Sequence, residues 1–219
     1  MRIEKIDTFK HKGLRQKLVD IIKEKGIKNI DVLNAINEVP RHFFLDLAFD
    51  KIAYEDRAFP IGEGQTISQP YTVAYQTELL NVQPREKVLE IGTGSAYQAT
   101  ILAAMGARVF TIERHKNLYD KNQLDYPLKS KYKNIKFFYG DGFKGLPTFM
   151  PFDKIIITAA APFTPDELIK QLKPKGVIVL PIGEQDEQTM IRITKNEDET
   201  LTEERFDKFT FVPMLKGQV

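Results

Sequence analysis

A glycine-rich turn, Gly92–Thr93–Gly94, follows the apolar segment KVLEI at residues 87–91. Glycine adopts positive φ without strain, and it lets a ligand approach the backbone because it has no Cβ. A helix expected to begin near Ala96 would present unpaired N–H groups at the same place. In open α/β sheets, ligands bind beyond the carboxyl end of such a strand. The segment therefore predicts a ligand site, although a tight strand-to-helix turn without a ligand would need the same glycines.

Acidic residues stand at the ends of the next two predicted strands. Glu113 closes RVFTIE at residues 108–113, and Asp141 lies in GDG directly after IKFFYG at 135–140. An acid about 20 residues beyond the glycine turn can accept hydrogen bonds from both hydroxyls of a ribose. Asp141 and the adjacent Gly142 stand where a side chain could meet the edge of an adenine. Together with the glycine turn, the two acids predict a nucleoside-type cofactor.

Glu90 and Tyr97 distinguish between two cofactors of that type. A dinucleotide fold requires Gly-x-Gly-x-x-Gly, but here Tyr97 occupies the third glycine position. Glu90 precedes Gly92 by two residues, where a carboxylate would repel a pyrophosphate and attract a cation. S-adenosyl-L-methionine carries an ammonium and a sulfonium group. We therefore expect S-adenosyl-L-methionine, and a nicotinamide-dependent oxidoreductase is the alternative.

Alternating strand and helix patterns position these residues. Apolar strands are expected at residues 87–91, 108–113, 135–140, 154–158 and 177–183. Helices are expected at residues 71–80, 96–105, 115–125 and 165–172. Strands that are apolar along their whole length are typical of a parallel sheet covered on both faces. The alternation therefore predicts an α/β fold with right-handed crossovers.

The two ends of the chain follow other patterns. Helices are expected at residues 14–25 and at 31–39, where Asp31 could cap the second helix. Residues 54–70 are rich in Pro and Gly, which predicts an irregular segment. Strands are expected at 189–195, 200–207 and 208–214, with a polar hairpin turn between the first two. We therefore expect an N-terminal helical cap and an antiparallel C-terminal edge on a mostly parallel, doubly wound sheet.

Composition excludes several classes of protein. The 219 residues are 42% hydrophobic and 28% charged, which favours a globular chain over a disordered one. The chain has no cysteine, so disulfide scaffolds, Cys-ligated metals and thiol catalysis are excluded. A net charge of +2 gives no strong field for nucleic acid. The N-terminus is polar and no apolar run approaches the ~20 residues of a membrane span, so we expect a cytoplasmic protein.

Seven segments together resemble the protein-L-isoaspartate O-methyltransferase family, from about residue 10 to Lys216. They are GQTISQPY (64–71), VLEIGTGSAYQ (88–98), FTIER (110–114), GDG (140–142), FDKIIITAAAP (152–162), LKPKGVIVLPIG (172–183) and FVPM (211–214). The glycine turn and LKPKG occur in many methyltransferases. GQTIS followed by a late TAAAP is much more specific to this family.

The resemblance implies a Rossmann-like methyltransferase fold and a protein-repair activity. A methyl group would pass from S-adenosyl-L-methionine to the free α-carboxylate of L-isoaspartyl residues, and whether D-aspartyl residues also react stays open. Ser68 would be the active-site residue beside the methyl group. Cofactor contacts would come from Gln65, Thr66, Ile67, Ser68, Glu90, Gly92, Thr93, Gly94, Glu113, Asp141 and Gly142. Thr158, Ala159, Val212 and Pro213 would form the substrate site.

Plainer explanations exist for several of these residues. Ser68 precedes the helix expected at 71–80, and serine is a favoured N-cap. Thr158 could simply end its strand. Family members usually have glycine where this chain has Ala96, so alanine would be strained there if the position needs positive φ. His11, His42 and His115 are scattered in the sequence and predict neither a catalytic dyad nor a metal site.

The chain is expected to form one domain over residues 1–219. The helical cap and covering loop would occupy 1–65, the cofactor-binding core 66–183 and a β extension 184–219. The expected partners are damaged proteins and peptides with isoaspartyl residues, and we expect no metal, nucleic acid or membrane. We expect a monomer. A methyltransferase with another substrate and a non-catalytic binding module are the remaining alternatives.

Overall fold

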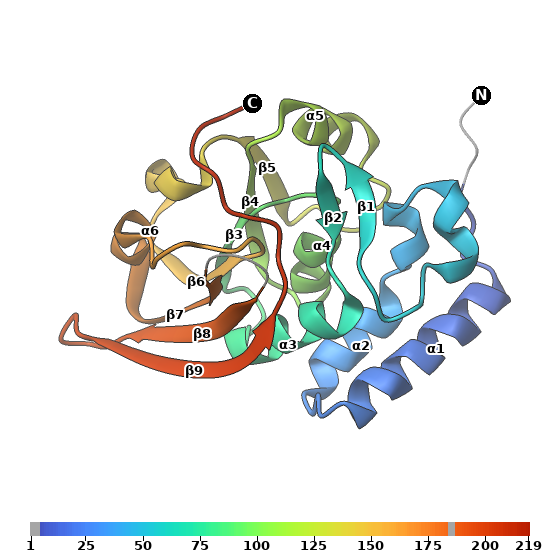
Figure 1. The fold of residues 1–219 in the computed structure, drawn as a ribbon, viewed down its shortest axis with the longest axis horizontal. Coiled ribbons are helices and arrows are strands. Elements are labelled where there is room, and N and C mark those ends of the chain that lie inside the picture. Colours follow the sequence, from blue (N-terminus) through green and yellow to red (C-terminus); the bar gives the residue numbers. More distant parts are fainter. Residues whose placement is uncertain (1–4, 184–186) are drawn as a thin grey trace.

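The computed structural model of the protein describes residues 5–183 and 187–219. Its main sheet has seven strands in the order β5-β4-β3-β6-β7-β8-β9 (Figure 1). The pairs from β5 to β7 are parallel, and β8 and β9 add antiparallel to the β7 edge. The strands are β3 Lys87–Ile91, β4 Arg108–Glu113, β5 Ile135–Tyr139, β6 Phe152–Ile157, β7 Leu172–Ile182, β8 Gln188–Lys195 and β9 Leu201–Phe209. The predicted mostly parallel sheet with an antiparallel C-terminal edge is confirmed.

Helices cover both faces of this sheet and form an N-terminal cap beside it (Figure 1). The α-helices are α1 Phe9–Glu24, α2 Ile30–Glu38, α3 Pro70–Leu80, α4 Tyr97–Ala104, α5 Lys116–Asp125 and α6 Asp166–Lys170. The 3-10 helices are η1 Arg41–Phe44, η2 Leu47–Ile52, η3 Gly142–Lys144 and η4 Pro147–Phe149. In the described residues, no helix combines the length and hydrophobicity that a membrane span needs.

Strand alternation divides the core into two clusters. Leu89 and Ile91 of β3 pack in the cluster on the α6 side of the sheet. Val88 packs on the opposite face with residues of α1 to α4. Because side chains alternate along a strand, Glu90 lies on the same face as Val88. Each face buries apolar side chains almost completely, and this burial is the main favourable contribution to folding.

The order of the strands places a ligand site at one point of the sheet. From β3 the chain moves outward to β4 and β5, and it then returns to β6 on the other side of β3. The carboxyl ends of β3 and β6 therefore flank a topological switch point, which is where open α/β sheets bind ligands. The glycine turn follows β3 at this point, and Thr158 follows β6.

Four local predictions are wrong. Asn29, not Asp31, caps α2, because its side chain accepts hydrogen bonds from the backbone of residues 31 and 32. The segment predicted to be irregular contains an antiparallel hairpin, β1 Phe59–Gly62 and β2 Gln65–Ile67, whose short strands carry too little pattern to predict. The region of the last two predicted strands holds the single strand β9 and an extended tail. Gln69, not Ser68, is the N-cap of α3.

The predicted boundary at residue 184 lies outside the described residues.

Candidate active site

Side chains from three elements fix the glycine turn after β3. Asn122 of α5 donates through Nδ2 to the Gly94 carbonyl at 2.9 Å. The Gly94 N–H donates to Oε2 of Glu113 at 2.8 Å. The Thr158 hydroxyl lies 3.0 Å from the Ile91 carbonyl oxygen and 2.8 Å from that of Gly92. The turn is therefore held in one shape by the ends of β4 and β6 and by α5.

Gly92 is required at its position for two reasons. Its φ is +96°, a conformation that side-chain-bearing residues rarely adopt. A Cβ there would also lie only 2.7 Å from the Thr158 hydroxyl oxygen. Any larger residue would push Thr158 away from the turn.

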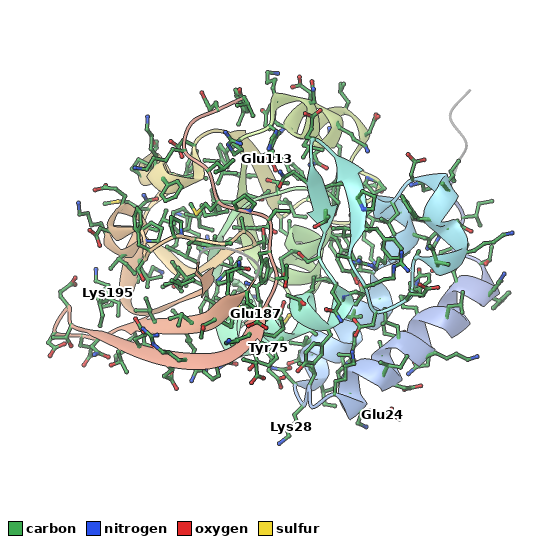
Figure 2. All side chains as sticks on the ribbon, viewed as in Figure 1. Glu24, Lys28, Tyr75, Glu113, Glu187 and Lys195 are labelled. Carbon is green, nitrogen blue, oxygen red and sulfur yellow. The ribbon has the colours of Figure 1, made fainter. Side chains whose placement is uncertain are left out.

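Glu113, labelled in Figure 2, is the last residue of β4. It is buried and lines the same cavity as the turn. Besides the Gly94 N–H, its carboxylate accepts a hydrogen bond from the His115 N–H at 2.9 Å. A carboxylate has about four acceptor positions, so positions remain for a ligand. The side chain therefore organises the backbone and can also bind the hydroxyls of a ribose.

The hairpin β1–β2 brings residues 68–71, here called the Ser68 segment, to the opposite side of the cavity. The turn of the hairpin is held by Asn117 of α5, which donates to the Glu63 carboxylate at 2.9 Å. Ile61 of β1 lies over the glycine turn, since a Cβ at Gly94 would approach its Cδ1 to 3.4 Å. Among the described residues, the Ser68 hydroxyl has no hydrogen-bond partner, so it is free to meet a ligand.

The C-terminal tail closes a third side of the cavity. Backbone hydrogen bonds of 2.8 Å join Ala160 to Val212 and Met214 to Ala160. Figure 1 shows the tail running from β9 across the carboxyl ends of the parallel strands toward α5. The Thr158–Pro162 loop and the tail thus form one wall.

The cavity between these elements opens to solvent, and its space is about 800 Å³ when the open mouth is included. Most of the predicted site residues line it: Gln65, Thr66, Ile67, Ser68, Gly92, Thr93, Gly94, Glu113, Gly142, Thr158, Ala159, Val212 and Pro213. Residues separated by up to 148 positions in the sequence, from Gln65 to Pro213, therefore face one space.

Glu90 does not line the cavity. Its side chain is fully buried beneath the turn, and its carboxyl oxygens have no hydrogen-bond partner among the described residues. Burial raises the pKa of Glu90 to about 8, and the nearby Glu113 carboxylate acts in the same direction. Glu90 is therefore mostly protonated at pH 7, and the structure gives it no direct path to a cationic ligand.

Asp141 also lies outside the cavity lining. Its carboxylate accepts hydrogen bonds from the N–H groups of Phe143 at 2.9 Å and Gly217 at 3.0 Å. Asp141 is the N-cap of η3 and holds the C-terminal tail, which places it beside the wall of the cavity.

The cavity also contains residues outside the predicted set. They are Val73, Ile91, Ser95, Tyr97, Gln98, Ile112, Arg114, His115, Met214 and Leu215. Ser95, Tyr97 and Gln98 follow the glycine turn so closely that their proximity to it was a usable signal.

Ala96 has a φ of +68° and is completely buried, so this chain keeps alanine where glycine would be unstrained.

Two histidines that the sequence separates come together in the N-terminal cap. The rings of His11 and His42 stack with their centroids 3.8 Å apart, and Asp7 lies beside them. The two residues stand 31 positions apart in the sequence, so no local spacing predicts this pair. The Asp7 carboxylate is bound by both terminal nitrogens of Arg15 at 3.0 Å.

The family model for protein-L-isoaspartate(D-aspartate) O-methyltransferase matches residues 13–219. A protein-L-isoaspartate O-methyltransferase from Cytophaga hutchinsonii is 53% identical over 209 residues, which cover 95% of this chain and 94% of the relative. One from Flavobacterium psychrophilum is 50% identical over 213 residues, covering 97% and 99%.

A solved structure shares the fold. It is described as a protein-L-isoaspartate O-methyltransferase from Plasmodium falciparum in complex with S-adenosyl-L-homocysteine. Its TM-score is 0.79 at 25% sequence identity, and the match covers 93% of this chain and 99% of that one. The family model, the two bacterial relatives and this fold agree, and the chain belongs to the protein-L-isoaspartate(D-aspartate) O-methyltransferase family.

Proposed function

We propose that this protein transfers a methyl group from S-adenosyl-L-methionine to the free α-carboxylate of L-isoaspartyl residues in damaged proteins and peptides. The observation that carries the proposal is the single cavity that brings Ser68, the glycine turn and Glu113 together. Family membership supports the choice of substrate.

The residues of the cavity suit the cofactor. Its ribose would lie against the Glu113 carboxylate, and its methionine half would lie along Gly92–Gly94, where the lack of side chains permits close approach. Gln65, Thr66 and Ile67 would cover it, and Gly142 would meet the adenine. When bound, S-adenosyl-L-methionine supplies a methyl group on a positively charged sulfur.

The substrate requires no catalytic base. The α-carboxyl group of an isoaspartyl residue has a pKa of ~3.3–3.7, so it is already an anion at pH 7. The protein needs to align this anion with the methyl group and exclude water, and such orientation contributes ~7–11 kcal/mol. Ser68 would donate a hydrogen bond to the carboxylate. Thr158, Ala159, Val212 and Pro213 would position the peptide backbone.

The product is a methyl ester, whose alcohol group leaves more readily than the oxygen of a carboxylate. The neighbouring backbone nitrogen can therefore close to a succinimide without further help from the protein, and this ring opens partly to normal aspartate. The chain is thus proposed to act in repair by labelling the damaged residue.

Two features disfavour the nicotinamide alternative. Tyr97 fills the third glycine position of the dinucleotide pattern and is almost fully buried in the core. The family match spans residues 13–219, which includes the whole cofactor region.

A methyl-transfer assay tests the proposal. The protein is incubated with radiolabelled S-adenosyl-L-methionine and either an isoaspartyl peptide or the same peptide with normal aspartate. We expect base-labile methyl ester only on the isoaspartyl peptide, at a rate that is flat above about pH 5 because the carboxylate is already ionised. Equal labelling of both peptides, or labelling of neither, would contradict the proposal.

A further inference from the structure

Arg41 is a charged residue buried directly behind the Ser68 segment. It begins η1 in the N-terminal cap and has no solvent exposure. Burial lowers the pKa of its guanidinium to about 10, so the group remains charged at pH 7. A buried charge without an ion-pair partner destabilises the folded state. The presence of Arg41 at this position therefore calls for a functional explanation.

The guanidinium contacts two parts of the candidate active site. Nη2 donates to the Ser68 carbonyl oxygen at 2.8 Å and lies 3.3 Å from the Arg57 carbonyl oxygen. The Arg41 guanidinium carbon also lies 4.8 Å from the centre of the Tyr97 ring, in a cation–π contact. Tyr97 begins α4 directly after the glycine turn and lines the cavity. Arg41 therefore joins the Ser68 segment to the helix that follows the cofactor loop.

The remaining donors of Arg41 are poorly used. Nε and Nη1 make no hydrogen bond of standard geometry among the described residues, and neither does the Tyr97 hydroxyl, although the guanidinium and this hydroxyl are close enough to interact electrostatically. Leaving buried donors unpaired destabilises a fold. Residues that work against stability in this way are found where function requires them.

Arg15, a second buried arginine of the same cap, shows the contrasting arrangement. Its Nη1 and Nη2 bind the Asp7 carboxylate at 3.0 Å, Nη1 also donates to the Tyr54 hydroxyl at 3.1 Å, and Nε donates to the Asn37 carbonyl. None of these three hydrogen-bond partners lines the cavity. The hydrogen bonds of Arg15 support the cap, whereas those of Arg41 support the Ser68 segment.

Asp56 holds the same segment from its other side. Its Oδ2 accepts a hydrogen bond from the Gln69 side chain at 3.0 Å, and its Oδ1 accepts one from the Tyr71 N–H at 2.8 Å. Arg41 therefore binds this segment at Ser68, and Asp56 binds it at Gln69 and Tyr71.

We infer that Arg41 is a positioning residue for methyl transfer, which fixes the Ser68 backbone and the Tyr97 ring and thereby aims the Ser68 hydroxyl at the substrate carboxylate. The inference rests on the proposed function, because it assigns Ser68 to the substrate. Arg41 acts through Ser68 and Tyr97 and is itself outside the cavity lining.

The test compares Arg41→Met with Arg15→Met in the full chain. We expect Arg41→Met to lower kcat tenfold to a hundredfold, roughly the effect of misplacing a group by about 1 Å. Its affinity for S-adenosyl-L-homocysteine, measured by calorimetry, should change by less than about threefold, because the contacts to the cofactor remain. Its melting temperature should fall by no more than about 3 °C, since the unpaired charge is also removed.

Arg15→Met should show the opposite pattern. It leaves the Asp7 carboxylate without its partner, so we expect the melting temperature to fall by about 5 °C or more, with kcat of the folded protein within about twofold of wild type. Hydrogen exchange gives a readout that does not depend on activity. Backbone amides of residues 65–69 should exchange faster in Arg41→Met and unchanged in Arg15→Met.

Arg41→Lys keeps the charge and covers the case in which Arg41→Met does not fold. Lysine cannot reproduce the planar guanidinium of arginine and its several N–H donors, so we expect kcat to fall at least about threefold. Wild-type kcat in either Arg41 variant would overturn the inference, as would equal loss of kcat in Arg41→Met and Arg15→Met. An inert wild-type protein would instead refute the proposed function, and the exchange of residues 65–69 would still test the contact itself.

Discussion

The glycine turn and the Ser68 segment face the same cavity but are held by different parts of the molecule. The turn is fixed by side chains at the ends of β4 and β6 and on α5, all within the α/β core. The Ser68 segment depends on Arg41 and Asp56, which precede that core in the chain. The difference indicates that cofactor binding and transfer can be separated by mutation. Single substitutions on each side of the cavity test that separation.

Glu113→Ala should have the largest effect, and it should act on cofactor binding. The change removes the acceptor of the Gly94 and His115 N–H groups together with the proposed ribose contact. Hydrogen bonds to a charged group contribute ~1.5–3 kcal/mol each, so the affinity for S-adenosyl-L-homocysteine should fall about a hundredfold or more. Calorimetry measures it, with Glu113→Gln as the control that keeps one acceptor oxygen. Unchanged affinity in Glu113→Ala would refute the assignment.

Glu90→Gln should change the pH dependence of stability. The pKa of Glu90 is raised from 4.5 to about 8 in the folded state, so its contribution to the free energy of unfolding is fully present below pH 4.5. This contribution is lost as the pH rises toward 8, at up to ~1.4 kcal/mol per pH unit. Urea unfolding at pH 5, 7 and 9 should show that the variant lacks this loss and is more stable than wild type at pH 9. A weakened cofactor affinity in Glu90→Gln would instead place the residue in the cofactor site.

Gly92→Ala should damage the turn itself. Positive φ and the clash with Thr158 predict a loss of about 2 kcal/mol in the free energy of unfolding, with weaker cofactor binding. Gly13→Ala is the matched control, because Gly13 is an exposed residue of α1 whose added Cβ would meet no atom within 4 Å. Alanine there should stabilise the protein by ~1 kcal/mol. Equal stability of Gly92→Ala and wild type would show that the turn tolerates a side chain.

Ser68→Ala should slow transfer more than it weakens cofactor binding. The hydroxyl has no partner among the described residues, so its removal should leave the melting temperature unchanged and should lower the affinity for S-adenosyl-L-homocysteine less than it lowers kcat. Loss of one hydrogen bond to a carboxylate predicts a kcat about tenfold lower. The methyl-transfer assay measures this rate. If Ser68→Ala weakened cofactor binding more than it slowed transfer, mutation would not separate cofactor binding from methyl transfer.

Ala96→Gly should have the smallest effect and the opposite sign. Alanine at a φ of +68° is strained, so glycine should raise the free energy of unfolding by about 1 kcal/mol. Ala99→Gly in the interior of α4 should lower it by about the same amount. A loss of stability in Ala96→Gly would show that the buried methyl group contributes more than the strain removes.

The sequence predicted the features that depend on local pattern. The parallel strands, the glycine turn and Glu113 could be placed because strand periodicity and the order of the strands determine where their ends meet. The positions of Thr158 and Pro213 in the same cavity rested on the family resemblance.

Features that depend on distant contacts were not predictable. The pairing of Arg41 with the Ser68 carbonyl joins residues 27 positions apart, and no periodicity signals it. The stacking of His11 on His42 joins α1 to η1. Glu90 was expected beside the cofactor from its spacing, but the alternation of side chains along β3 turns it toward the core.

A crystal structure with S-adenosyl-L-homocysteine tests the central claim most directly. The account predicts the ribose hydroxyls against the Glu113 carboxylate, the methionine portion along Gly92–Gly94, and the sulfur atom facing Ser68. A ligand bound elsewhere, or a ribose that leaves Glu113 untouched, would contradict it.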